Sequence, residues 1–299
     1  MAVVGCGTVG ASWAALFTAY GLDVAATDPG PGSAERLTAF VAQARAQLAE
    51  FGLTGDGRLS FHPELEAAVA NAEFVQENAP ETEALKRALL ARLDALLPPA
   101  VIVASSTSAM LRSAIVADCA RPERVVVAHP FNPPHLVPLV EIVAGDADVA
   151  ERAAAFYRRL GRRPVVLARE MPGHIANRLA SALYREAVNL VAEGVASVAD
   201  IDAALCNGPG LRWAAMGPHM TYHLGGGEGG IRHYLDHLGP SQVRRWASLG
   251  NPELDAAVKD RIVTGIEAEA QGRSIAELEG RRDRSLIDIL KARTEVAGR

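Results

Sequence analysis

Two residues twelve positions apart in the chain carry side chains suited to moving a proton. His129 follows the apolar run Val125–Ala128, and Glu141 lies inside a second apolar run, Leu139–Val143. Both runs have the length of buried strands. An imidazole at a strand end that faces a carboxylate on a neighbouring strand is a general base with an orienting partner, although a buried histidine can also be a satisfied core residue. We therefore take His129 as the candidate base and Glu141 as its partner.

A glycine-rich turn at the start of the chain has the spacing of a dinucleotide-binding fingerprint. The pattern G-x-G-x-x-G occupies residues 5–10, between an apolar strand and the helical stretch Ala11–Tyr20, and the next apolar run, Leu22–Thr27, ends at Asp28. In this context the glycines let backbone N–H groups approach a pyrophosphate, and the positive end of the helix favours its charge. An ordinary glycine turn in an α/β sheet is the plainer alternative.

The acid after the second strand selects the cofactor. Asp28 would accept hydrogen bonds from the adenosine ribose and would repel a 2′-phosphate, so the sequence predicts NAD rather than NADP. The predicted cofactor contacts are Gly5, Gly7, Thr8, Val9, Gly10, Asp28, Glu77 and Ser105.

A cluster of hydroxyl side chains, Ser105-Ser-Thr-Ser108, follows the strongly apolar segment Val101–Ala104. Ligands bind at the carboxyl ends of strands in doubly wound sheets, so these hydroxyls are candidate ligand contacts. They could equally cap the helix expected near Met110–Ala117, and we expect at least one of them to do so.

The elements that must position these residues alternate between strand and helix up to residue 168, which predicts one parallel sheet. After Glu170-Met-Pro-Gly173 the pattern contains helices and no convincing strand. We predict an α/β Rossmann-type doubly wound domain at 1–170 and an all-α domain at 171–299, with a hinge at Pro172-Gly173. The helices expected in the second domain are 175–193, 198–206, 218–224, 228–238, 253–270 and 275–296.

Composition excludes several classes of protein. The chain has 299 residues, 49% of them hydrophobic, which is enough for two domain cores. Its net charge of −5 argues against a nucleic-acid or anionic-membrane surface. No apolar run approaches a membrane span, no signal peptide precedes the first strand, and three scattered cysteines do not indicate disulfides or structural zinc. We expect a cytoplasmic protein.

Taken together, the motifs resemble those of the 3-hydroxyacyl-CoA dehydrogenase superfamily over essentially the whole chain. The matching segments are G-C-G-T-V-G at 5–10, E-N-A-P-E at 77–81, S-S-T-S at 105–108, H-P-F-N-P at 129–133, L-V-E at 139–141 and P-G-H-I-A-N-R at 172–178. The resemblance implies a nucleotide-binding domain and a helical domain that forms a homodimer. It also implies that His129 is the catalytic base, that Glu141 pairs with it, and that Ser108 and Asn177 contact the substrate oxygen. The family carries Phe where this chain has His174, which changes the polarity beside Asn177.

The second half of the chain resembles the carnitine dehydrogenase branch, on the segments 208–219 and 223–230. The gulonate 3-dehydrogenase (lambda-crystallin) group and the 3-hydroxyacyl-CoA enzymes are the alternatives. A carnitine-like substrate has a carboxylate, for which Arg212 is a bidentate donor, and a quaternary ammonium, which requires aromatic faces such as Trp213 and Tyr222. The two tryptophans of this region could instead fill the helical core, and Arg212 could cap a helix end.

Two other readings compete with a dehydrogenase. His219 and His223, and likewise His233 and His237, are four residues apart, so each pair lies on one helix face and could bind zinc. Neither pair has an obvious third ligand, and we predict no metal. Lambda-crystallin also shows that this fold can serve as a bulk structural protein. The joint presence of Ser108, His129, Glu141 and Asn177 favours an enzyme.

Overall fold

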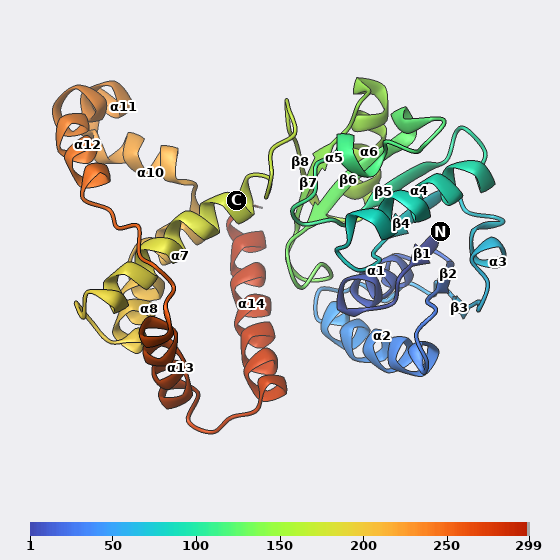
Figure 1. Cartoon of the computed structure of the whole chain (residues 1–299), viewed down its shortest axis with the longest axis horizontal. Coiled ribbons are helices and arrows are strands. Elements are labelled where there is room, and N and C mark those ends of the chain that lie inside the picture. Colours follow the sequence, from blue (N-terminus) through green and yellow to red (C-terminus); the bar gives the residue numbers. More distant parts are fainter. Residues whose placement is uncertain (298–299) are drawn as a thin grey trace. The chain divides into compact units, whose positions relative to one another are not determined.

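The computed structural model describes residues 1–297 and divides the chain into two compact units, Met1–Asn177 and the part from Arg178 onward (Figure 1). The first unit is an α/β structure, and the second is built from helices. The predicted fold class is confirmed.

The first unit is organised around one eight-stranded sheet, with strand order β3-β2-β1-β4-β5-β6-β7-β8. Its strands are β1 (Ala2–Val4), β2 (Val24–Thr27), β3 (Leu59–Phe61), β4 (Phe74–Glu77), β5 (Ile102–Ser105), β6 (Val125–Pro130), β7 (Leu139–Val143) and β8 (Arg163–Val166). Its helices are α1 (Thr8–Ala19), α2 (Ser33–Ala49), α3 (Leu65–Val69), α4 (Glu83–Leu96), α5 (Arg112–Ile115), the short 3₁₀ helix η1 (Pro122–Arg124) and α6 (Ala147–Arg159). The order reverses direction between β1 and β4, which makes the sheet doubly wound.

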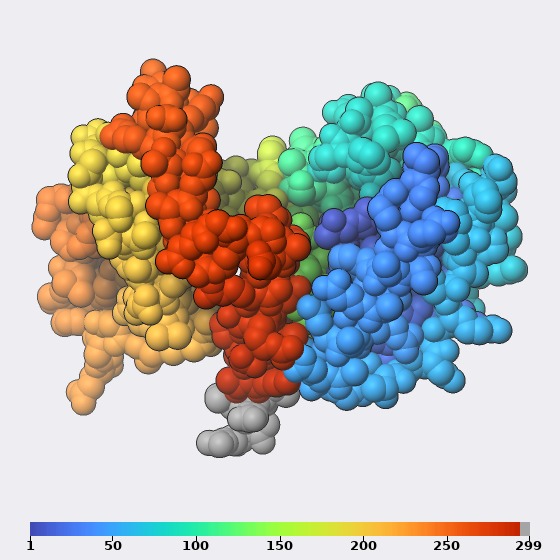
Figure 2. Space-filling model, turned by 90° about the horizontal axis from the view of Figure 1, so that it is seen from below, coloured from blue at the N-terminus to red at the C-terminus, as the bar shows by residue number. Residues whose placement is uncertain are grey.

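Two apolar cores cover the two faces of the sheet. One contains side chains of α1, α2 and α6, and the other contains side chains of α3, α4 and α5. Successive strand residues point to opposite faces, so Val126 and Ala128 enter the first core while Val125 and Val127 enter the second. The outer surface of α2 is seen in blue in Figure 2.

The sheet differs from the prediction at one strand. β7 runs antiparallel to β6, whereas the other neighbouring strands are parallel. A parallel connection needs a crossover of about a dozen residues or more, and the segment 131–138 is too short for one. The register pairs His129 with Glu141 directly across the two strands.

The loop that joins β6 to β7 is held by buried polar groups. The guanidinium of Arg162 donates to the carbonyl of Pro134 at 3.0 Å, and the Nδ1 atom of His135 lies 2.6 Å from the hydroxyl of Ser12 on α1. Both Arg162 and His135 are buried, and burial lowers the pKa of Arg162 to about 10. These bonds tie the loop to the body of the unit and so fix the strand ends that it connects.

The first helix begins earlier than the sequence suggested. α1 starts at Thr8 rather than Ala11, so the glycine pattern supplies its first turn. Gly5 has φ of 87°, and a Cβ on Gly10 would lie 1.9 Å from the carbonyl oxygen of Gly5. Both positions therefore need glycine for the strand to turn into the helix.

The second unit contains only helices among its described residues (Figure 1). Its elements are α7 (Ala176–Ala192, which begins at the end of the first unit), α8 (Val198–Asn207), α9 (Pro209–Ala215), α10 (Pro218–Gly225), η2 (Gly227–Gly229), α11 (Gly230–His233), the π-helical turn η3 (Tyr234–Leu238), α12 (Gly239–Ala247), α13 (Ala256–Ala270) and α14 (Ile275–Ala297). The sequence analysis missed α9 and α12. Both begin with a Gly-Pro pair, which the sequence analysis did not take as a helix start, although proline is favoured in the first helical turn.

The units separate after Asn177, later than the predicted boundary after residue 170. The cause is a set of hydrogen bonds, described below, that ties residues 174–177 to the sheet. Within residues 1–297, none of the helices combines the length and apolar character needed to cross a membrane.

Candidate active site

The imidazole of His129 and the carboxylate of Glu141 form a buried pair at the end of β6. His129 Nδ1 lies 2.8 Å from Glu141 Oε2, and the two residues are 4% and 1% exposed. An ionised carboxylate only accepts hydrogen bonds, so Nδ1 carries the hydrogen and Nε2 presents a lone pair. The pairing expected from the sequence is therefore formed within the first unit.

Glu141 also binds the chain that leads into α7. Its Oε1 accepts from the backbone N–H groups of Ile175 at 2.8 Å and Ala176 at 3.0 Å. Burial raises the pKa of Glu141, but the hydrogen bonds from His129 and these two N–H groups outweigh it, so the pKa lies below the ordinary value. The carboxylate stays ionised and ready to face an imidazolium.

Ser108 and Asn177 are joined by a hydrogen bond to a backbone oxygen. The carbonyl of Ser108 accepts from Asn177 Nδ2 at 3.2 Å, and its hydroxyl donates to Glu81 Oε1 at 3.2 Å. Both residues belong to the same unit as His129.

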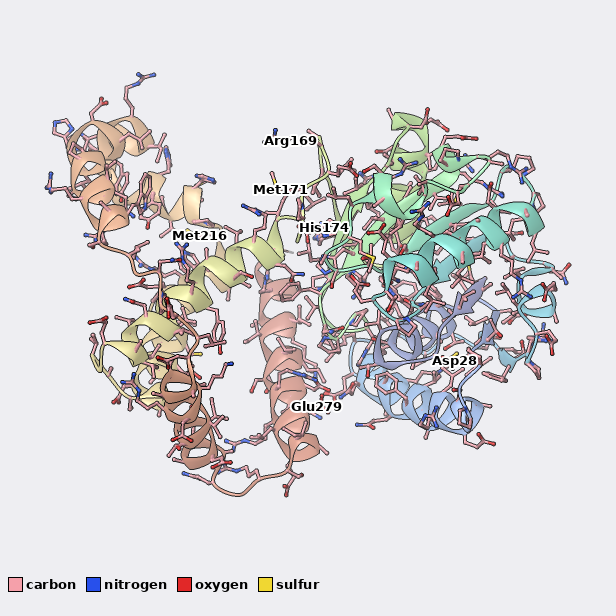
Figure 3. All side chains as sticks on the ribbon, viewed as in Figure 1. Asp28, Arg169, Met171, His174, Met216 and Glu279 are labelled. Carbon is pink, nitrogen blue, oxygen red and sulfur yellow. The ribbon has the colours of Figure 1, made fainter. Side chains whose placement is uncertain are left out.

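His174, the departure from the family pattern, lies against the candidate base. Its ring stacks on that of His129, with centroids 4.9 Å apart, and only 2% of the residue is exposed. Nδ1 of His174 donates to the Ser108 carbonyl at 3.2 Å, which leaves Nε2 unprotonated in the neutral ring. Burial and the neighbouring charge of His129 lower the pKa of His174. Figure 3 labels this side chain in the segment before α7.

The glycine turn offers a site for a dinucleotide. Gly7 and Thr8 are exposed, no side chain caps α1, and a Cβ on Gly7 would meet nothing within 4 Å. A pyrophosphate could therefore approach the helix N-terminus, where the helix dipole favours an anion.

Asp28 lies at the end of β2, beside this turn (Figure 3). Its carboxylate accepts from the N–H of Cys6 and of Gly30, each at 2.7 Å, and from the hydroxyl of Ser33. Partial burial raises the pKa of Asp28, but these hydrogen bonds outweigh it and the pKa is lowered. An anion at this place fits a ribose and disfavours a 2′-phosphate.

Two predicted cofactor contacts have a different environment from the one expected. Glu77 and Ser105 are both 0% exposed, and the Ser105 hydroxyl donates to Glu77 Oε2 at 2.5 Å. Glu77 also accepts from the buried ammonium of Lys86 at 2.9 Å and from the N–H of Ala79. Every polar atom of both side chains therefore bonds to protein, so neither side chain is directed at solvent. They join β4, α4 and β5 below the ligand-binding edge.

The expectation that a hydroxyl of residues 105–108 caps the next helix is wrong. α5 is shorter than predicted and begins after Leu111, with no side-chain cap. The hydroxyl of Thr107 instead donates to Glu81 at 2.6 Å and accepts from the N–H of Met110.

Comparison with known proteins places this geometry in a family. Residues 1–171 match the 3-hydroxyacyl-CoA dehydrogenase NAD binding domain, and residues 173–251 match the 3-hydroxyacyl-CoA dehydrogenase C-terminal domain. The chain belongs to the 3-hydroxyacyl-CoA dehydrogenase family. Its cofactor is accordingly NAD, and its reaction class is the oxidation of a 3-hydroxy group.

Relatives from several bacteria match nearly the full chain. An L-carnitine dehydrogenase of Streptomyces griseus is 51% identical over 98% of this chain and 89% of its own length. One of Pseudomonas aeruginosa is 45% identical over 100% of this chain and 95% of its own. Among solved structures, 5-formyl-3-hydroxy-2-methylpyridine 4-carboxylic acid 5-dehydrogenase, an NAD⁺-dependent dismutase, is 29% identical with a TM-score of 0.85, over 98% of this chain and 97% of that one.

The substrate-binding candidates of this family member lie in the helical unit and are described there by themselves. Arg212 and Trp213 are on α9, and Tyr222 is on α10, where its ring lies 4.9 Å from that of Tyr234. Trp213 is 40% and Tyr222 37% exposed, so neither fills a core.

Sequence reasoning missed the role of Glu81, which ends the E-N-A-P-E motif. This carboxylate holds residues 107–109, and an acid four residues after Glu77 and just before α4 was the available signal. The contact of His174 with His129 was not predicted either, because the two residues are far apart in sequence.

A group of three residues in the described chain, His129, Glu141 and His174, has ligand atoms within 4.8 Å of one another, as a metal site would. Both oxygens of Glu141 already accept hydrogen bonds, and Nδ1 of each histidine donates one. A metal that used Glu141 would have to displace the bonds that orient the base.

Proposed function

We propose that the protein is an NAD-dependent L-carnitine dehydrogenase, which oxidises the 3-hydroxyl of L-carnitine to give 3-dehydrocarnitine. The observation that carries the proposal is the buried His129–Glu141 pair in a chain 51% identical to an L-carnitine dehydrogenase along almost its full length. The alternatives within the family are an L-gulonate 3-dehydrogenase and a 3-hydroxyacyl-CoA dehydrogenase, and the alternative outside catalysis is a structural protein.

His129 is the general base of the proposed reaction. Its Nε2 removes the hydroxyl proton, and the paired carboxylate of Glu141 fixes the tautomer and stabilises the imidazolium that forms. When bound, NAD supplies the acceptor for the hydride that leaves the same carbon. The base must be neutral to act, so oxidation is favoured at alkaline pH.

Ser108 and Asn177 stabilise the oxygen that becomes a carbonyl. The amide of Asn177 donates one hydrogen to the Ser108 carbonyl, which leaves the second for the substrate. The hydroxyl of Ser108 makes the longest of the bonds to Glu81, so it can turn to the substrate while the shorter ones remain. Donors aimed at developing charge are a large source of rate enhancement.

The two charged ends of carnitine define the roles proposed for the helical unit. Arg212 binds the carboxylate, because a guanidinium matches it with two parallel hydrogen bonds. Trp213 and Tyr222 offer aromatic faces to the quaternary ammonium, which has no hydrogen to donate. Their exposure in the structure supports these roles.

The cofactor contacts proposed are Gly5, Gly7, Thr8, Val9, Gly10 and Asp28. The turn holds the pyrophosphate with backbone N–H groups, and Asp28 accepts from the ribose. Glu77 and Ser105 have fully buried side chains, so a contact from either one would use its backbone.

The deciding experiment is NAD reduction measured with L-carnitine, L-gulonate and 3-hydroxybutyryl-CoA as parallel substrates. The proposal expects carnitine to give the highest kcat/KM. A preference for either other alcohol would replace the substrate but keep the reaction class. Failure to bind NADH, seen as unchanged fluorescence and melting temperature, would favour a structural role.

We also propose that the protein is a homodimer formed through its helical unit. Large apolar side chains on the described helices of this unit are exposed, including Tyr184 at 59%, Trp246 at 60% and Val263 at 52%. An apolar cavity of about 120 Å³ lies among α7, α8 and α13, lined in part by Tyr184, Val198 and Ile266. Exposed apolar surface of this kind marks protein interfaces. Sedimentation equilibrium tests this, and a monomer at micromolar concentration would contradict it.

A cytoplasmic location is proposed as well. Cys6, Cys119 and Cys206 are free thiols, as suits a reducing compartment, and NAD is a soluble metabolite of that compartment. Fractionation of cells that express the protein, with detection by antibody, tests this location.

A further inference from the structure

A carboxylate that the mechanism does not use lies next to the catalytic serine. Four groups from three consecutive residues approach Glu81 Oε1: the hydroxyl of Thr107 at 2.6 Å, the N–H and hydroxyl of Ser108 at 2.7 and 3.2 Å, and the N–H of Ala109 at 3.1 Å. Residues 106–110 belong to no helix or strand. One carboxylate oxygen therefore restrains three consecutive residues of this loop.

The carboxylate of Glu81 is anionic. Its second oxygen lies 3.8 Å from the ammonium of Lys86, which is buried and bound to Glu77. Partial burial raises the pKa of Glu81, but the bonds from Thr107 and Ser108 and the charge of Lys86 outweigh it, and the pKa is lowered. Hydrogen bonds to an ionised acceptor are stronger than neutral ones, so the loop is held firmly.

The geometry of one peptide group transmits this restraint to the active site. The N–H of Ala109 and the carbonyl of Ser108 belong to the same planar trans peptide, so they point in opposite directions. With the N–H directed at Glu81, the carbonyl is directed at His174 Nδ1 and Asn177 Nδ2, each 3.2 Å away. Because a carbonyl only accepts, it holds the proton of His174 on Nδ1.

We propose that Glu81 is a positioning residue for the reaction. By fixing the 108–109 peptide it sets the Nδ1-protonated tautomer of His174, which stacks on the base, and the orientation of the Asn177 amide, which faces the substrate oxygen. Glu81 itself touches no reacting atom. The kinetic effect of Glu81 rests on the proposed function, whereas its effect on the tautomer of His174 does not depend on that function.

The first test reads the tautomer directly and needs no substrate. Long-range ¹⁵N–¹H correlation spectra of the labelled protein distinguish the two ring nitrogens, and the signals of His174 are assigned by their loss in His174→Gln. The wild type is expected to show the Nδ1-protonated ring, and Glu81→Ala a mixture of both tautomers. Glu83→Ala is the matched control, because Glu83 is two residues after Glu81, is exposed at the start of α4, and lies 4.0 Å from Arg87 rather than beside residues 107–109.

The second test measures kinetics. Glu81→Ala should lower kcat/KM for oxidation by about 10-fold to 100-fold, as a misplaced catalytic group does, with NAD affinity unchanged. Glu81→Gln keeps an acceptor oxygen and should lose less. If Glu81 acts by orienting the Asn177 amide, the losses in Glu81→Ala and Asn177→Ala are not additive in the double variant.

Several results would overturn the assignment. These are an Nε2-protonated His174 in the wild type, a tautomer that is unchanged in both Glu81 variants, or fully additive kinetic losses. If Glu81→Ala does not fold, Glu81→Gln carries both measurements. A wild type that oxidises none of the three alcohols refutes the proposed function, and the tautomer spectra then still decide the role of Glu81.

Discussion

The candidate residues of the two units differ in how far they are arranged before any ligand arrives. In the first unit His129, Glu141 and His174 are all less than 5% exposed, and every one has a hydrogen-bond partner. In the helical unit Trp213 and Tyr222 are each more than a third exposed. The group proposed for proton transfer is therefore preorganised by folding, whereas the exposed aromatic side chains can still lose solvent contact when a ligand binds. Catalysis requires groups that are fixed in place before the reaction. Substrate binding can instead be stabilised by exposed side chains that the ligand covers.

The largest effect is expected from replacing the proposed base, His129. His129→Gln should lower kcat by about 10²-fold to 10⁴-fold, the usual contribution of a positioned proton acceptor. NAD affinity, measured by fluorescence titration, should change little, because the cofactor turn lies on other strands. Turnover equal to that of the wild type would remove His129 from the mechanism.

Changes in the helical unit should act on substrate binding instead. Arg212→Lys loses the planar two-bond donor, and Trp213→Leu loses an aromatic face worth about 0.5–2 kcal/mol. Each should raise KM for carnitine by several-fold or more while kcat falls less, and steady-state kinetics measures both.

The contrast between the units would fail if these variants lowered kcat as much as His129→Gln does. Circular dichroism controls for folding. A wild type that oxidises gulonate but not carnitine would leave Arg212 as a carboxylate donor and remove the aromatic role.

A smaller effect is expected at the cofactor turn. Asp28→Ala removes both a ribose acceptor and a negative charge, so it should weaken NAD binding and narrow the preference over NADP by several-fold. Melting curves with each cofactor provide the measurement. If the wild type already binds both cofactors equally, Asp28 is not the residue that selects NAD.

The smallest expected difference between the units is in how much acid lowers their stability. Asp28, Glu81, Asp94 and Glu141, all in the first unit, have lowered pKa values. Each ionised carboxylate therefore stabilises the fold at pH values above its ordinary pKa near 4. This stabilisation is lost as the pH falls through the lower pKa that the group has in the folded protein. In the described helical unit only Glu277 has such a resolved shift, and it is fully exposed.

Urea unfolding at pH 6 and at about pH 3 measures this difference. Trp13 is fully buried in the first unit, and Trp246 lies in the second. Variants that keep only one of the three tryptophans, Trp13 or Trp246, therefore report on each unit. The free energy of unfolding seen by Trp13 should fall more between the two pH values. An equal or larger fall seen by Trp246 would contradict the expectation.

The sequence predicted well wherever a local pattern decides the structure. The placement of His129 and Glu141 on neighbouring strands was predicted from two short apolar runs, whereas the antiparallel direction of β7 was not predicted. The turn at Gly5–Gly10 follows from glycine spacing. What it could not predict were contacts between distant segments, such as Glu81 with residues 107–109 or His174 with His129. Periodicity also failed for α9 and α12, each shorter than ten residues.

The base and its carboxylate partner occupy adjacent strands of a single hairpin, residues 125–143. On the roles proposed above, mutations on α9 and α10 that change which alcohol is accepted lie outside the hairpin that carries the proposed base and its partner. Substrate preference and proton transfer are then separable, both in evolution and in the laboratory. An engineer who seeks a new substrate can randomise α9 and α10 while the hairpin stays constant, and can expect retained chemistry among the variants that fold.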